Sequence, residues 1–171
     1  TVRRSFRRRR IDVHSGVPVH GHDPSDAATT VRFGDDSTVE VDLVVVAGGR
    51  RPRGDSAGLV GTRVVVDERG FIQVDDRLRT GEPGVYAVGD VISTPQLAHV
   101  GFAEGMFAVR DLLGESPRPI DPTTVPWCIY SHPEAAFAGL TEAAAIEAGH
   151  DVVVSSHRFA GNGRAMIIGD V

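Results

Sequence analysis

The apolar residues near the start of the chain fall into short runs broken by glycine, proline and acidic residues. Residues 1–10 are dominated by arginine and predict the tail of a basic helix, followed by short strand segments at residues 11–14 and 17–19. Residues 29–33 and 38–41 alternate apolar and polar side chains around a turn-forming Gly-Asp-Asp-Ser cluster. The alternation predicts a β-hairpin.

Two later segments are more apolar and predict buried strands. Leu43–Val46 is continuously apolar and mostly β-branched, which is typical of a strand that is buried on both faces. Residues 85–88 have the same character and end in Gly89-Asp90. Between these two segments, residues 64–66 and 71–74 flank an Asp-Glu-Arg-Gly turn, which predicts a second hairpin.

The longest periodic segment predicts a helix from about Gln96 to Leu113. An apolar stripe runs along it, made of Phe102, Met106, Val109 and Leu113. Gly114 is the residue type that most often follows the last turn of a helix. A predicted buried strand is therefore followed by a loop and an amphipathic helix.

The remaining part of the chain reads as a separate region. Residues 115–124 contain three prolines and no periodicity, so we predict a linker and a domain boundary there. Residues 127–130 are predicted to form a strand, and Thr141 is predicted to cap a helix that ends before Gly149. Residues 152–155 are predicted to pair as a strand with residues 165–168.

Composition and charge exclude some functions. The net charge of −5 argues against a protein that binds nucleic acid through bulk charge. The arginine run near the start points the other way, but Phe6 is the only aromatic residue within it, so we interpret the run as a solvated helix face. We predict neither a nucleic-acid partner nor membrane association, since the apolar runs are far shorter than the roughly 20 residues of a membrane-spanning helix.

The single cysteine and the histidines give no metal or disulfide site. Cys128 has no second cysteine in the chain to pair with, and its strand position predicts a buried structural residue. His14, His20, His22 and Asp23 match no metal-ligand spacing, so we predict no metal.

Gly89 and Asp90 are the most informative pair, because open parallel sheets bind ligands at the carboxyl ends of their strands. A carboxylate that only accepts hydrogen bonds suits the hydroxyls of a sugar or ribitol, and the following helix start offers unpaired N–H groups. An isolated Gly-Asp pair is more often a plain strand–turn–helix with an Asp cap. The choice between a ligand site and a plain strand–turn–helix therefore depends on the surrounding residues.

Those residues resemble the pyridine nucleotide-disulfide oxidoreductase family. Its second flavin fingerprint is a Thr, a spacer, and then Val-Tyr-Ala-Val/Ile-Gly-Asp, to which Thr80 and residues 85–90 are similar. Leu97-Ala98-His99 followed by Glu104-Gly105 resembles the dihydrolipoyl dehydrogenases of this family and differs from its glutathione and mercuric reductases.

The resemblance implies cofactor-binding roles for seven residues. Asp90 would hold the flavin ribitol and Gly89 would leave room for it. Gln96, Leu97, Ala98 and His99 would place backbone N–H groups near the pyrimidine end of the isoalloxazine, where the helix dipole favours reduced flavin. Residues 45–52 resemble the run that ends in Gly-Arg-x-Pro, in which Gly49 would approach NAD.

The resemblance also implies an α/β and α+β architecture in three pieces. Residues 1–50 would be the end of a Rossmann-like NAD-binding domain, residues 51–118 the closing part of an FAD-binding domain, and residues 119–171 the first half of a dimerisation domain. Residues 125–139 and 159–165 carry the similarity to the dimerisation domain.

The implied activity is oxidation of dihydrolipoamide by NAD through FAD and a redox disulfide. The implied protein is a cytoplasmic homodimer that serves the lipoyl-bearing subunits of 2-oxo acid dehydrogenase complexes. The disulfide, the glycine-rich phosphate loops and the family's His-Glu base do not occur in these residues, so we predict no catalytic residue here and a fragment that is inactive alone. Two alternatives stay open: a mercuric, glutathione or transhydrogenase-type reductase, or a non-catalytic remnant.

Overall fold

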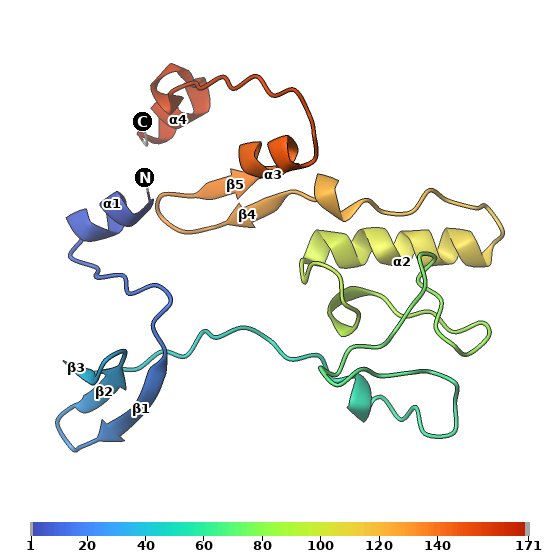
Figure 1. Cartoon of the computed structure of the whole chain (residues 1–171), viewed down its shortest axis with the longest axis horizontal. Helices are drawn as coiled ribbons and strands as arrows, with labels where there is room; N and C mark the ends of the chain where they lie inside the picture. The colour runs from blue at the N-terminus through green and yellow to red at the C-terminus, as the bar shows by residue number, and fades with distance from the viewer. Residues whose placement is uncertain (1, 170–171) are drawn as a thin grey trace. The chain divides into compact units, whose positions relative to one another are not determined.

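The computed structural model describes residues 2–169 and is a mixed α/β structure (Figure 1). Thr1, with which the predicted basic helix begins, lies outside the described residues, as do residues 170 and 171. The chain divides into two compact units, residues 1–49 and residues 50–171. Each unit is considered by itself.

Unit 1 consists of one short helix and a three-stranded sheet. Helix α1 spans Val2–Arg8, in agreement with the predicted basic helix. Strands β1 (Val19–Pro24), β2 (Thr29–Phe33) and β3 (Ser37–Val41) form an antiparallel sheet in that order. The predicted hairpin is confirmed as β2–β3, because its alternating residues form a regular antiparallel register.

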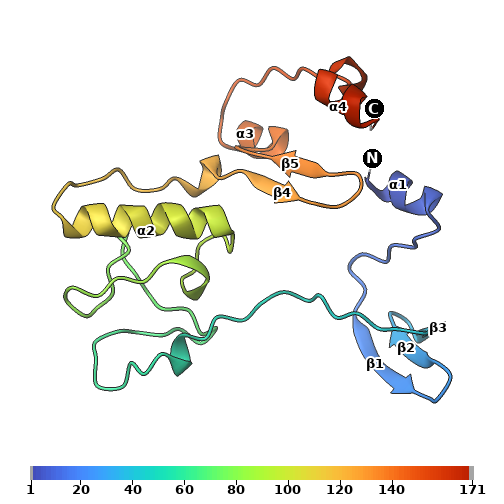
Figure 2. The same cartoon turned by 180° about the vertical axis from the view of Figure 1, so that it is seen from behind.

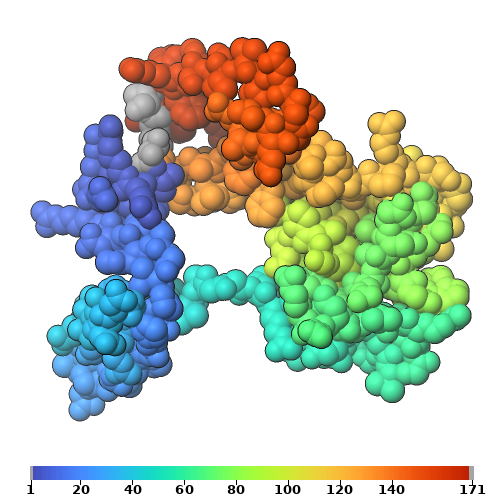
Figure 3. Space-filling view, in the orientation of Figure 1, coloured from blue at the N-terminus to red at the C-terminus, as the bar shows by residue number. Residues whose placement is uncertain are grey.

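Two strand predictions in unit 1 are wrong. Residues 11–14 and 17–18 are irregular, and β1 begins only at Val19. Leu43–Val46 is also irregular and exposed, with Val46 at 88% exposure, and Figure 3 shows this turquoise segment as a thin strip of atoms. A strand needs neighbours for its backbone hydrogen bonds, and no strand of the described residues pairs with this one.

The core of unit 2 lies beneath helix α2 (Ala98–Leu112), which Figures 1 and 2 show crossing the loops that precede it. Its centre is a cluster of buried apolar side chains from those loops and from α2, made of Ile72, Leu78, Ala87, Ile92 and Phe107. Burial of these side chains is the main stabilising contribution that the described contacts of this unit provide.

The loops beneath α2 contain isolated bridges where strands were predicted. The second predicted hairpin forms the bridge Val66–Ile72 and the hydrogen bond from Asp67 N to Phe71 O, at 2.8 Å. The predicted buried strand at residues 85–88 is reduced to the bridge Arg79–Tyr86. The burial of Ala87 agrees with the prediction, but among the described residues this segment forms no pairing beyond that bridge.

Helix α2 buries a different face from the predicted apolar stripe. The stripe of Phe102, Met106, Val109 and Leu113 is exposed. The buried face consists of Val100, Glu104, Phe107, Ala108 and Asp111. The carboxyl groups of Glu104 and Asp111 on this face form hydrogen bonds with polar groups of the loops. The hydrophobicity pattern alone therefore did not identify this face. Gly114 follows the helix with a φ of +80°, and its N–H donates to Asp111 O, which confirms its position after the last turn.

The carboxyl-terminal part contains a small hairpin. A 3-10 turn, η3 (Pro122–Thr124), precedes β4 (Trp127–Ile129), which pairs antiparallel with β5 (Ala135–Phe137). The rings of Trp127 and Phe137 stack with centroids 5.9 Å apart. Cys128 lies on β4 as predicted but is exposed, contrary to the prediction of a buried residue.

The last two helices confirm one prediction and contradict another. Helix α3 (Glu142–Glu147) is capped as predicted, with Thr141 Oγ1 accepting from Ala144 N at 3.2 Å. Residues 152–155 form no strand, and their predicted partner is helix α4 (Gly163–Ile168). Asn162 caps α4 by accepting from Ala165 N at 3.1 Å, which provides a local start signal that the strand prediction overlooked.

Replacing Thr141 with alanine is expected to weaken α3 by about 1 kcal/mol, because one N–H of its first turn loses its acceptor. Hydrogen exchange of the Ala148 amide, which donates to Ala144 O at 3.0 Å, should then become about fivefold faster. Thr141→Ser keeps the hydroxyl and serves as the control. Equal exchange in both variants would contradict the capping role.

Candidate functional site

The candidate site is centred on the loop between the core of unit 2 and α2. Gly89 begins a 3-10 turn, η2 (Gly89–Val91), with a φ of +74°. This left-handed conformation favours glycine, although a Cβ atom there would meet nothing within 4 Å. The Asp90 side chain is half-exposed, and its Oδ2 lies 3.8 Å from Arg50 Nε. The loop therefore presents an accessible carboxylate beside open space.

The start of α2 adds backbone and side-chain donors to this loop. Gln96 Nε2 donates to the carbonyl oxygen of Asp90 at 3.3 Å. Leu97 is the N-cap and provides no side-chain cap, so the N–H groups of Ala98 and His99 lie in an uncapped first turn. The predicted residues from Gly89 to Gln96 are thus brought together by direct contact. His99 is directed elsewhere, with Nε2 2.9 Å from Pro126 O.

Glu104 is a site residue that the sequence interpretation missed. Its side chain is fully buried, and Oε2 accepts a hydrogen bond from Gly89 N at 2.6 Å. One turn earlier, Gly101 is so close to the loop that a Cβ atom there would lie 3.5 Å from Gly89 Cα. The sequence feature that could have identified Glu104 is a carboxyl group at the centre of a helix face that also carries Val100 and Phe107.

A second buried carboxylate lies further along the same helix face. Asp111 accepts hydrogen bonds from Tyr86 Oη at 2.7 Å, Arg79 Nε at 2.8 Å and Arg77 Nε at 2.5 Å. The Tyr86 hydroxyl and the two guanidinium groups, against the opposing effect of burial, lower the pKa of Asp111 to about 2. Hydrogen bonds with the Tyr86 hydroxyl and with Asp111 raise the pKa of Arg79. This cluster joins α2 to the loops through a carboxylate whose side chain is buried, so we interpret it as structural.

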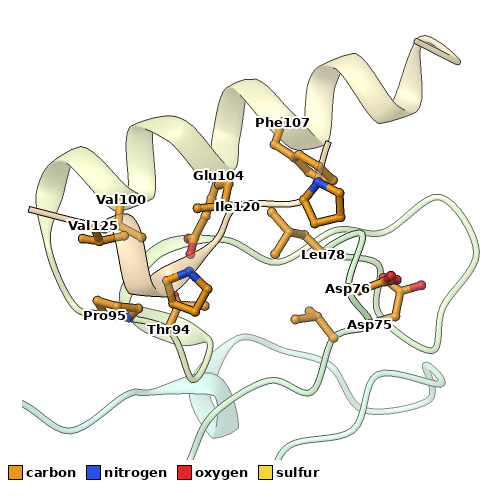
Figure 4. A pocket seen from close by; sticks show the side chains of 13 residues that line it. Asp75, Asp76, Leu78, Thr94, Pro95, Val100, Glu104, Phe107, Ile120 and Val125 are labelled. Carbon is orange, nitrogen blue, oxygen red and sulfur yellow. The ribbon is translucent and has the colours of Figure 1, made fainter. Parts of the chain in front are cut away.

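A cavity of about 230 Å³ lies beneath α2, on the side of Glu104 and Phe107 (Figure 4). Its lining is mainly apolar. Thr94 contributes a buried hydroxyl that has no hydrogen-bond partner among the described residues. Neither Gly89 nor Asp90 lines this cavity, so it is distinct from the candidate loop.

The other candidates contribute nothing to this loop. Gly49 is the last residue of unit 1, is exposed and has a φ of +104°. These features do not test its approach to NAD, which stays a prediction. No group of three metal-ligating side chains occurs among residues 2–169. No helix in the described part of the chain is long and apolar enough to cross a membrane.

Comparison with known families agrees with the resemblance. Residues 1–105 match the family described as "Pyridine nucleotide-disulphide oxidoreductase", and residues 125–170 match its dimerisation domain. The chain belongs to this family of oxidoreductases. The flavin fingerprint and the loop of Gly89 and Asp90 fall within the first match, and the β4–β5 hairpin falls within the second.

Curated relatives of this chain are dihydrolipoyl dehydrogenases. One from Bacillus subtilis is 36% identical over 172 residues, which cover 99% of this chain and 36% of the relative. Another, from Haloferax volcanii, is 39% identical over 161 residues, covering 91% of this chain and 34% of the relative. The chain spans about a third of the length of these relatives.

Solved structures show the same fold. The HOCl-induced flavoprotein disulfide reductase RclA from Escherichia coli superposes on 99% of this chain with a TM-score of 0.88 and 27% identity, covering 38% of the RclA chain. LpdA from Mycobacterium tuberculosis superposes on 98% of this chain and 37% of its own, with a TM-score of 0.89 and 24% identity. The latter likeness supports the fold alone.

Proposed function

We propose that this chain is the part of a dihydrolipoyl dehydrogenase that carries the flavin-facing loop and half of the dimerisation domain. The observation that carries the proposal is the half-exposed Asp90 carboxylate, which lies in the loop leading to the uncapped start of α2. The motif Leu97-Ala98-His99 and the names of the curated relatives support the subfamily.

The residues of the loop fit a flavin cofactor. Asp90 would accept hydrogen bonds from ribitol hydroxyls, and the open space at Gly89 would admit the ligand. The N–H groups of Ala98 and His99 would face the electron-rich end of the ring system, whereas the Leu97 N–H already donates to Pro95 O at 2.8 Å. FAD, when bound, supplies the acceptance of electrons from a dithiol and their transfer to NAD. Gln96 would keep the Asp90 main chain in place.

The wider proposal follows the implied domain plan. Residues 1–50 would contribute to NAD binding through Gly49, residues 51–118 to FAD binding, and residues 119–171 to a homodimer interface. The match of residues 125–170 to the dimerisation domain supports the homodimer. The proposed setting is the cytoplasm, and the proposed partners are lipoyl-bearing subunits of 2-oxo acid dehydrogenase complexes.

The test is a chimera in which this chain replaces the matching 36% of the Bacillus subtilis enzyme. The chimera is expected to purify with FAD and to oxidise dihydrolipoamide with NAD. Flavin without this activity, but with activity on another disulfide or on mercuric ion, would favour another member of the family. A folded chimera without flavin would refute the proposal.

In the same chimera, Asp90→Ala is expected to weaken FAD binding roughly ten- to a hundredfold, the range for losing hydrogen bonds to a charged group. Flavin absorbance per protein after gel filtration at low protein concentration is the measurement. Asp151→Ala removes an exposed carboxylate that makes no described contact, and it is the control. Unchanged flavin content in Asp90→Ala would remove Asp90 from the site.

A further inference from the structure

We propose that Glu104 is a positioning residue that fixes the Gly89–Asp90 loop in the conformation that presents the Asp90 carboxylate to the cofactor. The inference rests on the proposed flavin site and adds to it a residue on α2 that reaches the loop from below. Glu104 is assigned no contact with the cofactor. Its role is exercised through the Gly89 N–H group.

A short hydrogen bond joins Glu104 to Gly89. Glu104 Oε2 lies 2.6 Å from Gly89 N, a short separation that is typical of a strong hydrogen bond. Glu104 is 2% exposed, so its carboxyl group is shielded from water, and Gly89 is partly buried. Removing a buried carboxyl acceptor leaves the Gly89 N–H without a partner, which is unfavourable away from solvent.

The Gly89–Asp90 loop is held at two points by residues 96–104 of the chain. Glu104 binds the main chain at Gly89 N, and Gln96 binds it at the Asp90 carbonyl. Gly101 lies beside Gly89, where a Cβ atom would make an ordinary van der Waals contact at 3.5 Å with Gly89 Cα. The Asp90 side chain leaves the main chain between the two fixed groups, so Gln96 and α2 together set its direction.

The contact between Glu104 and Gly89 limits which groups of the loop remain for a ligand. Because the Gly89 N–H is already used, the loop recognises the cofactor through the Asp90 carboxylate and through the open side of Gly89. A neutral amide at position 104 retains a carbonyl acceptor of the same size. Glu104→Gln should therefore preserve the loop, whereas Glu104→Met, of similar volume, should release it.

The test in this chain is hydrogen exchange of individual backbone amides, followed by NMR. Glu104→Met is expected to accelerate exchange at Gly89 roughly ten- to a hundredfold. The Ala87 amide, which donates to Leu78 O at 3.2 Å, serves as the internal reference for general loss of stability and should change little. Glu104→Gln should keep most of the protection at Gly89.

Asp111→Asn is the matched control, because it alters another buried carboxylate on the same face of α2 that does not contact the loop. It should not accelerate Gly89 selectively. Acceleration of Gly89 and Ala87 to the same extent in Glu104→Met, or a selective effect in Asp111→Asn, would overturn the proposal.

The chimera separates this inference from the proposed function. If the unsubstituted chimera holds FAD, Glu104→Met should lose about tenfold or more in affinity and Glu104→Gln should retain it. Full FAD affinity in Glu104→Met would overturn the positioning role while the flavin site stands. A flavin-free unsubstituted chimera would refute the flavin site, and with it the role of Glu104 toward a cofactor, even where amide exchange confirms the contact.

Discussion

Replacing Phe107 with alanine is expected to lower the free energy of unfolding of unit 2 by about 3–5 kcal/mol. The Phe107 side chain is 5% exposed and belongs to the central core cluster with Ile92 and Leu78. Its ring also lies 5.7 Å from the Arg77 guanidinium carbon, so the substitution removes a cation–π contact as well. The cavity beneath α2 would be enlarged. Urea unfolding followed by circular dichroism is the measurement.

Phe102→Ala is the matched control, because it makes the same change on the same helix at a residue that is 77% exposed. Its effect is expected to stay within about 0.5 kcal/mol. The pair also distinguishes the two possible core faces of α2. A larger effect at Phe102 than at Phe107 would contradict the packing described above and favour the face predicted from the apolar stripe.

The sequence predicted those elements whose signals are local. The β2–β3 hairpin follows from alternation around a turn, and α3 follows from the Thr141 hydroxyl, which reaches an N–H three residues away. The length of α2 was also recognised within two residues at its start and one at its end. Each of these features depends on interactions within a few residues of the chain.

Features that depend on distant neighbours were not predicted correctly. Leu43–Val46 has the composition of a buried strand, but a strand of this type requires partners on both sides, and the described residues provide none. The buried face of α2 contains Glu104 and Asp111, whose burial becomes favourable only with partners from loops 15 or more residues away. A hydrophobicity pattern gives no information about such partners.

The candidate site was predicted in part for the same reason. Gly89, Asp90 and Gln96 are close in sequence, and the structure brings them into contact. Arg50 and Glu104 also reach this loop, but their contacts follow from the folding of α2 and of residues 50–54 onto it. A motif therefore located the loop, and only the three-dimensional structure shows what holds it.

Asp111→Asn is expected to destabilise unit 2 at neutral pH and to have a smaller effect in acid. The substitution leaves Arg77 and Arg79 without the carboxylate that accepts their hydrogen bonds, although the side chain keeps its size. Removing one partner of a buried charged cluster is strongly unfavourable because the others lose their compensation. Tyr86 would keep an acceptor in the amide oxygen.

The pH dependence follows from the lowered pKa of Asp111. The unfolded chain takes up the proton near the ordinary value of 3.8, whereas the folded chain takes it up only at about 2. The contribution of this carboxylate to stability is therefore complete above the unfolded value and is lost as the pH falls through the folded value. The difference in stability between the parent chain and Asp111→Asn should shrink over this window.

Urea unfolding of both chains at about pH 7 and about pH 3 tests this, since the difference between them isolates Asp111 from the other carboxyl groups. Tyr86→Phe removes the hydroxyl that contributes most to the lowered pKa and should raise the pKa of Asp111, as followed by the chemical shift of its carboxyl carbon. A stability difference that stays constant between the two pH values would show that the cluster does not hold Asp111 in its charged form. The two arginines would then be bound to α2 by the shape of the carboxyl group and not by its charge.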